Sequence, residues 1–306
     1  MAMNLLPENI VNLLNAVTEH VQYPVKDPHE IVLDVLRLDK IHPVISGNKW
    51  FKLKYYLEDA LRKDQKRLLS FGGAYSNHII ATACAAQQAG LQSTGIIRGE
   101  RPAILSHTLS AAAALGMDLV FVSRSSYNQK GDPAFIEMLQ QEYNNPCIVP
   151  EGGEGNSGKK GASEILQLVN RDNYTHLLCA VGTGTLLAGL AASKTQKQQL
   201  IGIPVLKGFE GWPMPLLSTR EKEGTHIVND YHFGGYAKKN SLLFDFMNEW
   251  YQATGIPSDF VYTGKLFFGA IDLIKKGYFP KNSRILVVHS GGLQGNGSLP
   301  PKTLVF

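Results

Sequence analysis

The segment His176-Leu-Leu-Cys-Ala-Val-Gly-Thr-Gly-Thr-Leu-Leu-Ala-Gly189 joins an apolar strand pattern to an apolar helix pattern through a glycine turn. Backbone N–H groups at such a helix N-terminus, together with threonine hydroxyls, form a cradle that suits a phosphate. The spacing does not fit a P-loop, because no Gly-Lys-Ser/Thr follows, and Gly182, Gly184 and Gly189 miss the G-x-G-x-x-G spacing of dinucleotide enzymes. On this segment alone, phosphate binding and a tight turn with close strand–helix packing are equally good interpretations.

Similar strand, glycine and helix units recur along most of the 306 residues. Apolar β-branched runs predict strands at Ile31–Leu36, Arg67–Phe71, Ser93–Arg98, Asp118–Val122, Cys147–Val149, His176–Val181, Leu200–Val205 and Arg284–His289. Helical spacing predicts helices at Trp50–Arg62, Asn77–Gln88, Ile104–Leu115, Asp132–Gln141, Gly161–Val169, Leu186–Ser193, Asn240–Thr254 and Leu266–Lys276. This alternation indicates an α/β fold with parallel sheets flanked by helices, in which ligands bind beyond the carboxyl ends of the strands.

The composition excludes several classes of protein. A hydrophobic fraction of 44% and a charged fraction of 18% are typical of a globular chain with a sizeable core. The net charge of +4 is spread without a block of like charges, so no nucleic-acid partner is expected. Three scattered cysteines and nine histidines without an H-x-x-x-H pair predict neither a disulfide framework nor a metal site. No leader-like N-terminus or long apolar run is present, which predicts a cytoplasmic protein without a membrane partner.

The segment Ser46-Gly-Asn-Lys-Trp-Phe-Lys-Leu-Lys54 is the most informative for chemistry. Asn48 is a candidate N-cap for the helix that follows, which places Lys49 in the first turn. The positive end of the helix dipole disfavours an ammonium there, and a lowered pKa is what a Schiff-base lysine needs. Lys52 lies one turn on, where it can meet an anionic group. The alternative is that both are ordinary surface lysines.

The segment Ser70-Phe-Gly-Gly-Ala-Tyr-Ser-Asn-His78 is another strand, glycine turn and helix start. Ser76 or Asn77 can serve as a helix N-cap, and the same geometry suits a carboxylate. The glycine-rich stretch Pro150–Gly161 predicts a long surface loop or a crossover between domains. His289 ends a strand and is expected to be a hydrogen-bonded structural residue.

Five motifs appear in one order: Gly47-Asn-Lys49, Gly72-Gly-x-x-Ser-Asn-His78, Thr183-Gly-Thr185, Val261-Tyr-Thr-Gly-Lys265 and His289-Ser-Gly-Gly292. Together they resemble the 1-aminocyclopropane-1-carboxylate (ACC) deaminase / D-cysteine desulfhydrase family of pyridoxal-phosphate (PLP) enzymes. The resemblance covers roughly residues 30 to 295 and implies a two-domain tryptophan synthase β-like fold (fold type II). The expected large domain comprises residues 1–50 and 146–306, and the smaller inserted domain comprises residues 51–145. A homodimer is expected from the resemblance alone.

The resemblance also implies roles for individual residues. Lys49 would carry PLP, Asn77 would bind the phenolic oxygen of the cofactor, and Ser76 would bind the substrate carboxylate or assist proton transfer. The other implied residues are Gly182, Thr183, Gly184 and Thr185 for the phosphate with help from Lys52, Thr263 and Ser290 near the pyridine nitrogen, His78 beside the substrate, and Tyr262 and Tyr236 as active-site tyrosines. Matching Tyr236 to the second active-site tyrosine of the family requires a gap.

Two positions bear on the choice of substrate. Deaminase members usually carry Glu and Leu where this chain has Thr263 and Ser290, whereas D-cysteine desulfhydrases typically carry small hydroxyl residues at both. A hydroxyl favours a less protonated pyridine ring than a carboxylate does. This favours β-elimination from a small D-amino acid, with D-cysteine first and ACC deamination or racemisation as alternatives.

Trp50-Phe51 departs from the family, which usually has a small or aliphatic residue and then Arg. A non-catalytic PLP or amino-acid sensor is the alternative outside enzymes, while a nicotinamide enzyme is disfavoured by the glycine spacing.

Overall fold

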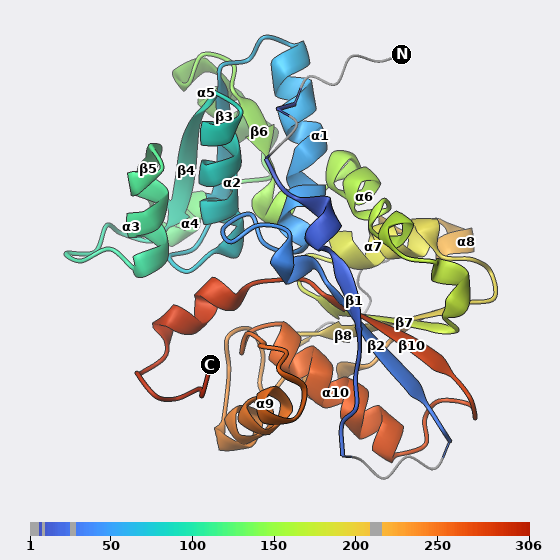
Figure 1. The fold of residues 1–306 in the computed structure, drawn as a ribbon. Coiled ribbons are helices and arrows are strands. Elements are labelled where there is room, and N and C mark those ends of the chain that lie inside the picture. The colour runs from blue at the N-terminus through green and yellow to red at the C-terminus, as the bar shows by residue number, and fades with distance from the viewer. Residues whose placement is uncertain (1–5, 8–9, 25–28, 209–215) are drawn as a thin grey trace.

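In the computed structural model, which describes residues 6–7, 10–24, 29–208 and 216–306, the chain forms two β-sheets with helices around them (Figure 1). The strands are β1 (Val17–His20), β2 (Val32–Arg37), β3 (Arg67–Gly72), β4 (Gln92–Arg98), β5 (Met117–Val122), β6 (Cys147–Val149), β7 (His176–Val181), β8 (Gln199–Pro204), β9 (Thr225–Ile227) and β10 (Arg284–His289). The α-helices are α1 (Asn48–Arg62), α2 (Asn77–Gln88), α3 (His107–Ala114), α4 (Arg124–Tyr127), α5 (Pro133–Glu142), α6 (Asn156–Ala162), α7 (Thr185–Ser193), α8 (Thr219–Lys222), α9 (Ser241–Thr254) and α10 (Thr263–Lys275).

The large sheet has the strand order β1-β2-β10-β7-β8-β9, and every pairing in it except β1 with β2 is parallel. Successive side chains of a strand point to opposite faces. In β7, Leu177 and Cys179 pack with α7, whereas Leu178 and Ala180 pack with α9 and α10 on the other face. Both faces are therefore buried, which is why these strands read as continuous apolar runs.

The small sheet is fully parallel, with the order β5-β4-β3-β6. Ile97 of β4 packs with α2 and α3, and the adjacent Ile96 packs with Tyr127 and Leu139 from α4 and α5. The small sheet is thus also covered on both faces, by α2 and α3 on one and by α4 and α5 on the other.

Helix α1 connects the two sheets. Its Phe51, Leu53 and Leu57 belong to one continuous apolar core that includes Leu68 of the small sheet and Leu177 of the large sheet. Helix α1 therefore packs against both sheets. The predicted domain limits remain a prediction, although β6 pairs with β3 of the small sheet and a limit after Val149 would keep that sheet whole.

The structure corrects the sequence analysis at the glycine-rich crossover. The stretch predicted as a surface loop, Pro150–Gly161, contains most of α6, and the predicted helix Gly161–Val169 holds only a 3-10 segment, Ile165–Leu168, after the end of α6. Glycines recur every three residues at 155, 158 and 161. A Cβ at Gly161 would lie 1.6 Å from the Phe51 carbonyl oxygen, so Gly161 allows α6 to pack directly against α1. A Cβ at Gly158 would lie 1.8 Å from the Gly153 carbonyl oxygen, so Gly158 allows the crossover to fold back on α6.

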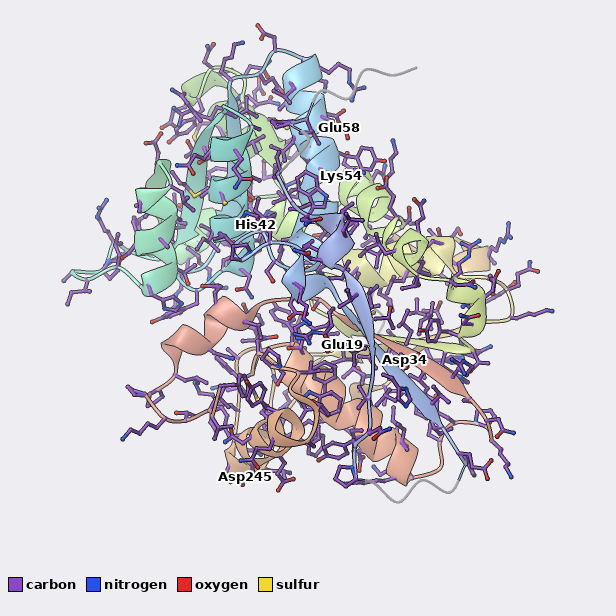
Figure 2. The ribbon with its side chains drawn as sticks, in the orientation of Figure 1. Glu19, Asp34, His42, Lys54, Glu58 and Asp245 are labelled. Carbon is purple, nitrogen blue, oxygen red and sulfur yellow. The ribbon has the colours of Figure 1, made fainter. Side chains whose placement is uncertain are left out.

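The sequence analysis also missed strands β1 and β9 and short helices α4 and α8. Strand β1 has a polar sequence and is largely exposed, so it carries no apolar pattern. Polar contacts hold it instead: Arg37 of β2 pairs with Glu19 at 2.7 Å, and His20 lies 2.9 Å from Asp34 (Figure 2). No helix among the described residues is long and apolar enough to cross a membrane.

Candidate functional site

The predicted site residues lie at helix N-termini that follow the carboxyl ends of strands from both sheets. Ser76, Asn77 and His78 follow β3, Gly182 to Thr185 follow β7, and Ser290 follows β10. Lys49 lies in the first turn of α1, between the two sheets. This is the edge at which parallel sheets bind ligands.

Lys49 is held by a close approach between α1 and the end of β10. The N-cap of α1 is Gly47 (φ +68°) rather than the predicted Asn48, and a Cβ at Gly47 would lie 1.9 Å from the Ser290 carbonyl oxygen. The Lys49 ammonium donates to Asn48 Oδ1 at 2.9 Å and lies 5.9 Å from the centroid of the Tyr262 ring. Burial lowers the pKa of Lys49 to about 8, against the opposing attraction of Asp259. Roughly a tenth of this amine is therefore neutral at pH ~7.

Lys52 is a second buried amine, one turn further along α1. It is 5% exposed, and burial together with the charge of Lys49 lowers its pKa to about 7. Neither amine forms an ion pair with another described residue. Two buried amines that form no ion pair with a described residue suit an anionic ligand.

The glycine turn after β7 has the form of a phosphate cradle. Gly184 adopts the left-handed conformation (φ +83°) as N-cap of α7, and the hydroxyls of Thr183 and Thr185 lie 3.1 Å apart. The glycine-rich crossover closes over the same region, because a Cβ at Gly152 would lie 2.9 Å from Thr183 and one at Gly153 would lie 2.8 Å from Lys52 Cβ. N–H groups, hydroxyls and a buried amine therefore gather there.

His78 is neutral, and its tautomer follows from its neighbours. Ser70 donates its one hydroxyl proton to the Val149 carbonyl at 2.8 Å, so it must accept from His78 Nε2 at 2.9 Å. His78 Nδ1 is then a buried acceptor with no partner among the described residues. Burial, then the charges of Lys49 and Lys52, lower the pKa of His78 to about 3. A neutral acceptor beside two amines fits a site that takes up a further polar group.

Ser76 and Asn77 open α2. Ser76 Oγ accepts from Ile79 N at 3.3 Å, so it acts as the N-cap that the sequence allowed. The Asn77 carbonyl oxygen accepts from the Gln294 side chain, which leaves its amide N–H groups for another partner. Gly292 (φ +100°) approaches this amide so closely that a Cβ there would lie 3.0 Å from Asn77 Nδ2.

The two predicted tyrosines contact each other. Their rings lie 6.1 Å apart in an edge-on arrangement, and Tyr236 is 49% exposed. Burial, followed by the neighbouring Tyr236 phenol, raises the pKa of Tyr262 well above its ordinary value, and burial raises the pKa of Tyr236. Both phenols are therefore protonated at neutral pH. Gly182 allows the Tyr262 ring to approach, since a Cβ at Gly182 would lie 3.1 Å from it.

Asp259 is a buried carboxylate that the sequence analysis missed. It accepts from the backbone N–H groups of Val261, Tyr262 and Thr263 at 2.9 to 3.0 Å and so caps α10. Thr263 donates its hydroxyl proton to Asp259 at 2.8 Å and accepts from Asp259 N at 2.7 Å, so this hydroxyl can only accept from a ligand. Ser290, which is 7% exposed, forms no side-chain hydrogen bond with the described residues and keeps its proton available. An Asp four residues before a Thr at a helix start was the signal for this cap.

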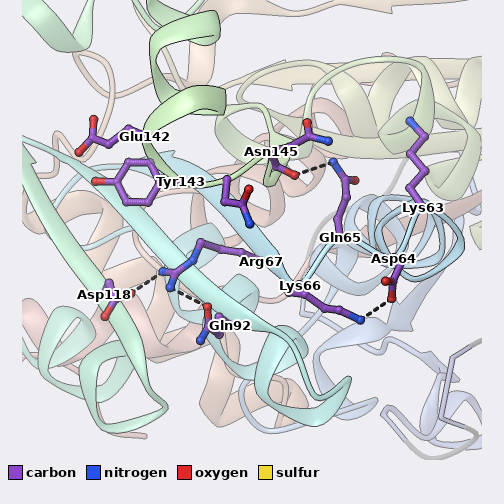
Figure 3. Close-up of a pocket in the computed structure, with 11 residues that line it drawn as sticks. Lys63, Asp64, Gln65, Lys66, Arg67, Gln92, Asp118, Glu142, Tyr143 and Asn145 are labelled. Carbon is purple, nitrogen blue, oxygen red and sulfur yellow. Dashed lines mark hydrogen bonds and ion pairs between the residues drawn. The ribbon is translucent and has the colours of Figure 1, made fainter.

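A hollow of about 510 Å³ lies elsewhere, beside the amino ends of the small-sheet strands (Figure 3). Arg67 begins β3, and its guanidinium contacts Asp118, Gln92 Oε1 at 2.7 Å and Thr94 Oγ1 at 2.6 Å. Lys66 pairs with Asp64 in the same hollow. Arg67 pairs with Asp118 and Lys66 pairs with Asp64, at the edge opposite the site residues, so this hollow is a poor candidate for chemistry.

The residues at the carboxyl edge fit PLP. The threonine and glycine cradle with Lys52 suits its phosphate, and the Lys49 amine suits its aldehyde. No cluster of His, Cys, Asp and Glu among the described residues is arranged to hold a metal ion. His289 is structural, as expected, with Nε2 at 2.8 Å from the Pro257 carbonyl and Nδ1 accepting from Gly291 N.

Known proteins resemble this chain over nearly its whole length. A putative ACC deaminase from Thermotoga maritima is 30% identical over 282 residues, which is 85% of this chain and 88% of the relative. The mitochondrial bifunctional D-cysteine desulfhydrase/ACC deaminase of Arabidopsis thaliana is 28% identical, covering 88% of this chain and 74% of the relative. The crystal structure of an ACC deaminase homologue superimposes with a TM-score of 0.75 at 26% identity, covering 90% of this chain and 93% of that chain.

These similarities confirm the predicted fold type II architecture, the resemblance and the cofactor. The family model described as pyridoxal-phosphate dependent enzyme matches residues 28–291. With the two buried lysine amines, the phosphate cradle and the matching fold in place, the chain belongs to the pyridoxal-phosphate dependent enzymes.

Proposed function

We propose that this enzyme eliminates a β-substituent from a small D-amino acid, with D-cysteine as the first candidate, and that Lys49 both carries the cofactor and moves the α-proton. The observation that carries the proposal is the Lys49 amine, whose pKa is about 8 and whose ammonium lies 5.9 Å from the Tyr262 ring centroid. An amine with that pKa exchanges a proton near neutral pH, as a general base must.

PLP, when bound, withdraws electrons from the α-carbon of the amino acid and so acidifies its C–H bond. In our proposal Lys49 Nζ accepts that proton in its neutral form. The helix α2 N-terminus and Ser76 would bind the substrate carboxylate, as helix N-termini bind anions. Lys52 would remain with the phosphate cradle, because it is one turn deeper along α1 and 5% exposed.

The tyrosines suit the role of acids. Both phenols hold their protons at neutral pH, and Tyr262, whose ring centroid lies 5.9 Å from the Lys49 ammonium, would donate its proton to the leaving thiolate. The net reaction is D-cysteine plus water to pyruvate, ammonia and hydrogen sulfide. Loss of the Tyr262 hydroxyl would therefore slow departure of the thiol more than binding of the amino acid.

The second candidate is ACC deamination, which converts ACC and water to 2-oxobutanoate and ammonia. The relatives named above carry one or both activities in their names, so they support either substrate. One local observation favours the alternative: Thr263 gives its proton to Asp259, and can only accept from a protonated pyridine ring. The hydroxyl at Ser290, which keeps its proton, favours the unprotonated ring of the first candidate.

The test is a substrate panel with the PLP-loaded protein: D-cysteine, L-cysteine, D-serine and ACC. We expect sulfide and pyruvate from D-cysteine at a kcat/KM at least tenfold above any 2-oxobutanoate formation from ACC. The reverse order would assign the protein to ACC deamination. Turnover of L-cysteine alone, or of none of the four, would contradict the proposed substrate class.

We further propose a homodimer in the cytoplasm. The homodimer rests on the family resemblance, and sedimentation of the PLP-loaded protein tests it. The compartment rests on Cys84, Cys147 and Cys179, which are all buried and unpaired. Unpaired cysteines are typical of proteins in a reducing environment.

A further inference from the structure

Gln294 lies in the 3-10 segment η8 (Leu293–Ser298), which follows β10 and packs against α3 (Figure 1). Its side chain contacts the N-termini of two helices of the small sheet at once. It bonds to Asn77 at the start of α2, and to His107 and Thr108 at the start of α3. No role for Gln294 was predicted from the sequence.

The backbone carbonyl of Gln294 determines which atoms donate and which accept in this group of hydrogen bonds. The Gln294 backbone oxygen can only accept, so His107 Nε2, at 2.9 Å, must carry a proton and donate it. That N–H also lies 3.2 Å from the Gln294 side chain, so the side-chain atom facing it must be the oxygen. Thr108 Oγ1 donates to the same oxygen at 2.9 Å.

This orientation turns the Gln294 amide nitrogen toward Asn77. The nitrogen donates to Asn77 Oδ1, which fixes the Asn77 amide in turn. Asn77 Nδ2 then faces away from Gln294, toward Gly292 and the buried Asp259. Asn77 is thereby a donor toward the site, and a donor is what an ionised phenolic oxygen requires.

We propose that Gln294 is a positioning residue that fixes Asn77 as a hydrogen-bond donor to the cofactor and couples this orientation to the contact between η8 and α3. The inference rests on the proposed function, because it assumes that Asn77 meets PLP. Residues 293–298 come from the chain after the large sheet, whereas Asn77 and Thr108 belong to helices on the small sheet. The donor orientation of Asn77 is therefore stabilised only while the two parts of the molecule are in contact.

The experiment compares Gln294→Glu with Gln294→Met in the full-length protein. A carboxylate cannot donate to Asn77 Oδ1, so the Asn77 amide turns over and presents its oxygen to the cofactor. We expect Gln294→Glu to weaken PLP binding about tenfold, the worth of one charge-assisted hydrogen bond, and to shift the visible absorption band. Gln294→Met, which leaves Asn77 free to rotate, should weaken binding about threefold.

Two further variants separate positioning from a general structural effect. Gln140→Glu, on the exposed face of α5, makes the same charge change and should leave PLP affinity and the band unaltered. In an Asn77→Ala background, Gln294→Glu should cause no additional change in PLP affinity or in the band, because its effect acts through Asn77. If Gln294→Glu does not fold, Thr108→Val removes the donor to Gln294 Oε1 and should shift the band in the same direction by less.

The outcomes distinguish the inference from the proposed function. Wild-type PLP affinity and an unshifted band in the folded Gln294 variants, or an undiminished effect in the Asn77→Ala background, would overturn the inference alone. A wild-type protein that takes up no PLP would overturn the proposed function, and the inference with it.

Discussion

The positively charged side chains at the two edges of the small sheet differ in whether they have ion-pair partners. At the amino edge, Arg67 and Lys66 contact Asp118 and Asp64 and lie in an open hollow (Figure 3). At the carboxyl edge, the amines of Lys49 and Lys52 are buried, form no ion pair with a described residue and have lowered pKa values, although Lys49 as a whole is partly exposed. Charges that a fold satisfies internally are structural, whereas buried charges left without a counter-ion are held for a ligand.

Substitution of Lys49 should cause the largest change. We expect Lys49→Ala to lower kcat at least about 1000-fold, since it removes both the attachment point and the proposed base. PLP should still bind through the cradle and Lys52, but without the visible band of the wild type. An absorption spectrum and a turnover assay check this, with Lys54→Ala on the same helix as the control. Retained turnover in Lys49→Ala would contradict the idea that the amine at the carboxyl edge is held for catalysis.

Substitution of Lys52 should separate ligand binding from stability. Lys52→Met removes a buried amine near the phosphate cradle and should weaken PLP binding about 10- to 100-fold, as loss of a hydrogen bond to a charged group does. The same change should raise the free energy of unfolding of the PLP-free protein, by on the order of 1–3 kcal/mol, because no buried amine remains to desolvate. Cofactor titration and urea unfolding measure the two effects. Weaker PLP binding without a gain in the stability of the PLP-free protein would contradict the idea that the buried Lys52 amine lacks a counter-ion.

The pH dependence of the PLP-free protein should reveal the same two amines. In the folded state the pKa values of Lys49 and Lys52 are about 8 and about 7, whereas an unfolded lysine titrates near 10.5. The unfolded chain therefore binds more protons across this window, and the free energy of unfolding should rise with pH from ~7 to ~10. Urea unfolding at several pH values tests this against Lys52→Met, which should show a shallower slope. A flat profile in the wild type would mean that the amines are not buried without counter-ions.

The smallest effect is expected at the amino edge. Arg67→Met removes the contacts with Asp118, Gln92 and Thr94 and should cost about 1 kcal/mol of stability, as expected for a partly exposed ion pair. The kcat and the PLP affinity should stay at wild-type values. A loss of PLP affinity in this variant would show that the two edges are not independent.

Much of the fold follows from local patterns. The parallel strands such as β7 and β10 are buried on both faces, and their continuous apolar runs identified them within a residue or two. Strand β1 was not predicted because it is held by backbone pairing with β2 and by polar contacts from Arg37 and Asp34, and neither leaves an apolar periodicity in the sequence. Helix α6 was not predicted because it contains glycines, which are poor helix formers. Close packing requires them, of Gly161 against α1 and of Gly158 against Gly153, and only the tertiary structure reveals this packing.

In the site, too, local sequence patterns predicted some residues, whereas others depend on tertiary contacts. Lys49 and the Thr183-Gly-Thr185 turn could be predicted, because each belongs to a strand, glycine and helix unit. Gln294 could not be placed from spacing, since it acts through residues far away in the sequence, such as Asn77 at a separation of 217 residues. Asp259 left a local signal four residues before Thr263, but its complete burial is known only from the packed structure. The lowered pKa of Lys52 likewise depends on burial and on the charge of Lys49, which only the packed structure supplies.

The most direct test of this account is reductive trapping of the cofactor followed by peptide mapping. The PLP-loaded protein is treated with borohydride, digested, and searched for the lysine that carries the pyridoxyl group. Lys49 and Lys52 are both buried amines on the same helix, so the mapping must resolve the two. Modification of Lys49 alone is the result that we predict. Modification of Lys52, or of no lysine in α1, would contradict the assignment of Lys49 as the residue that carries the cofactor.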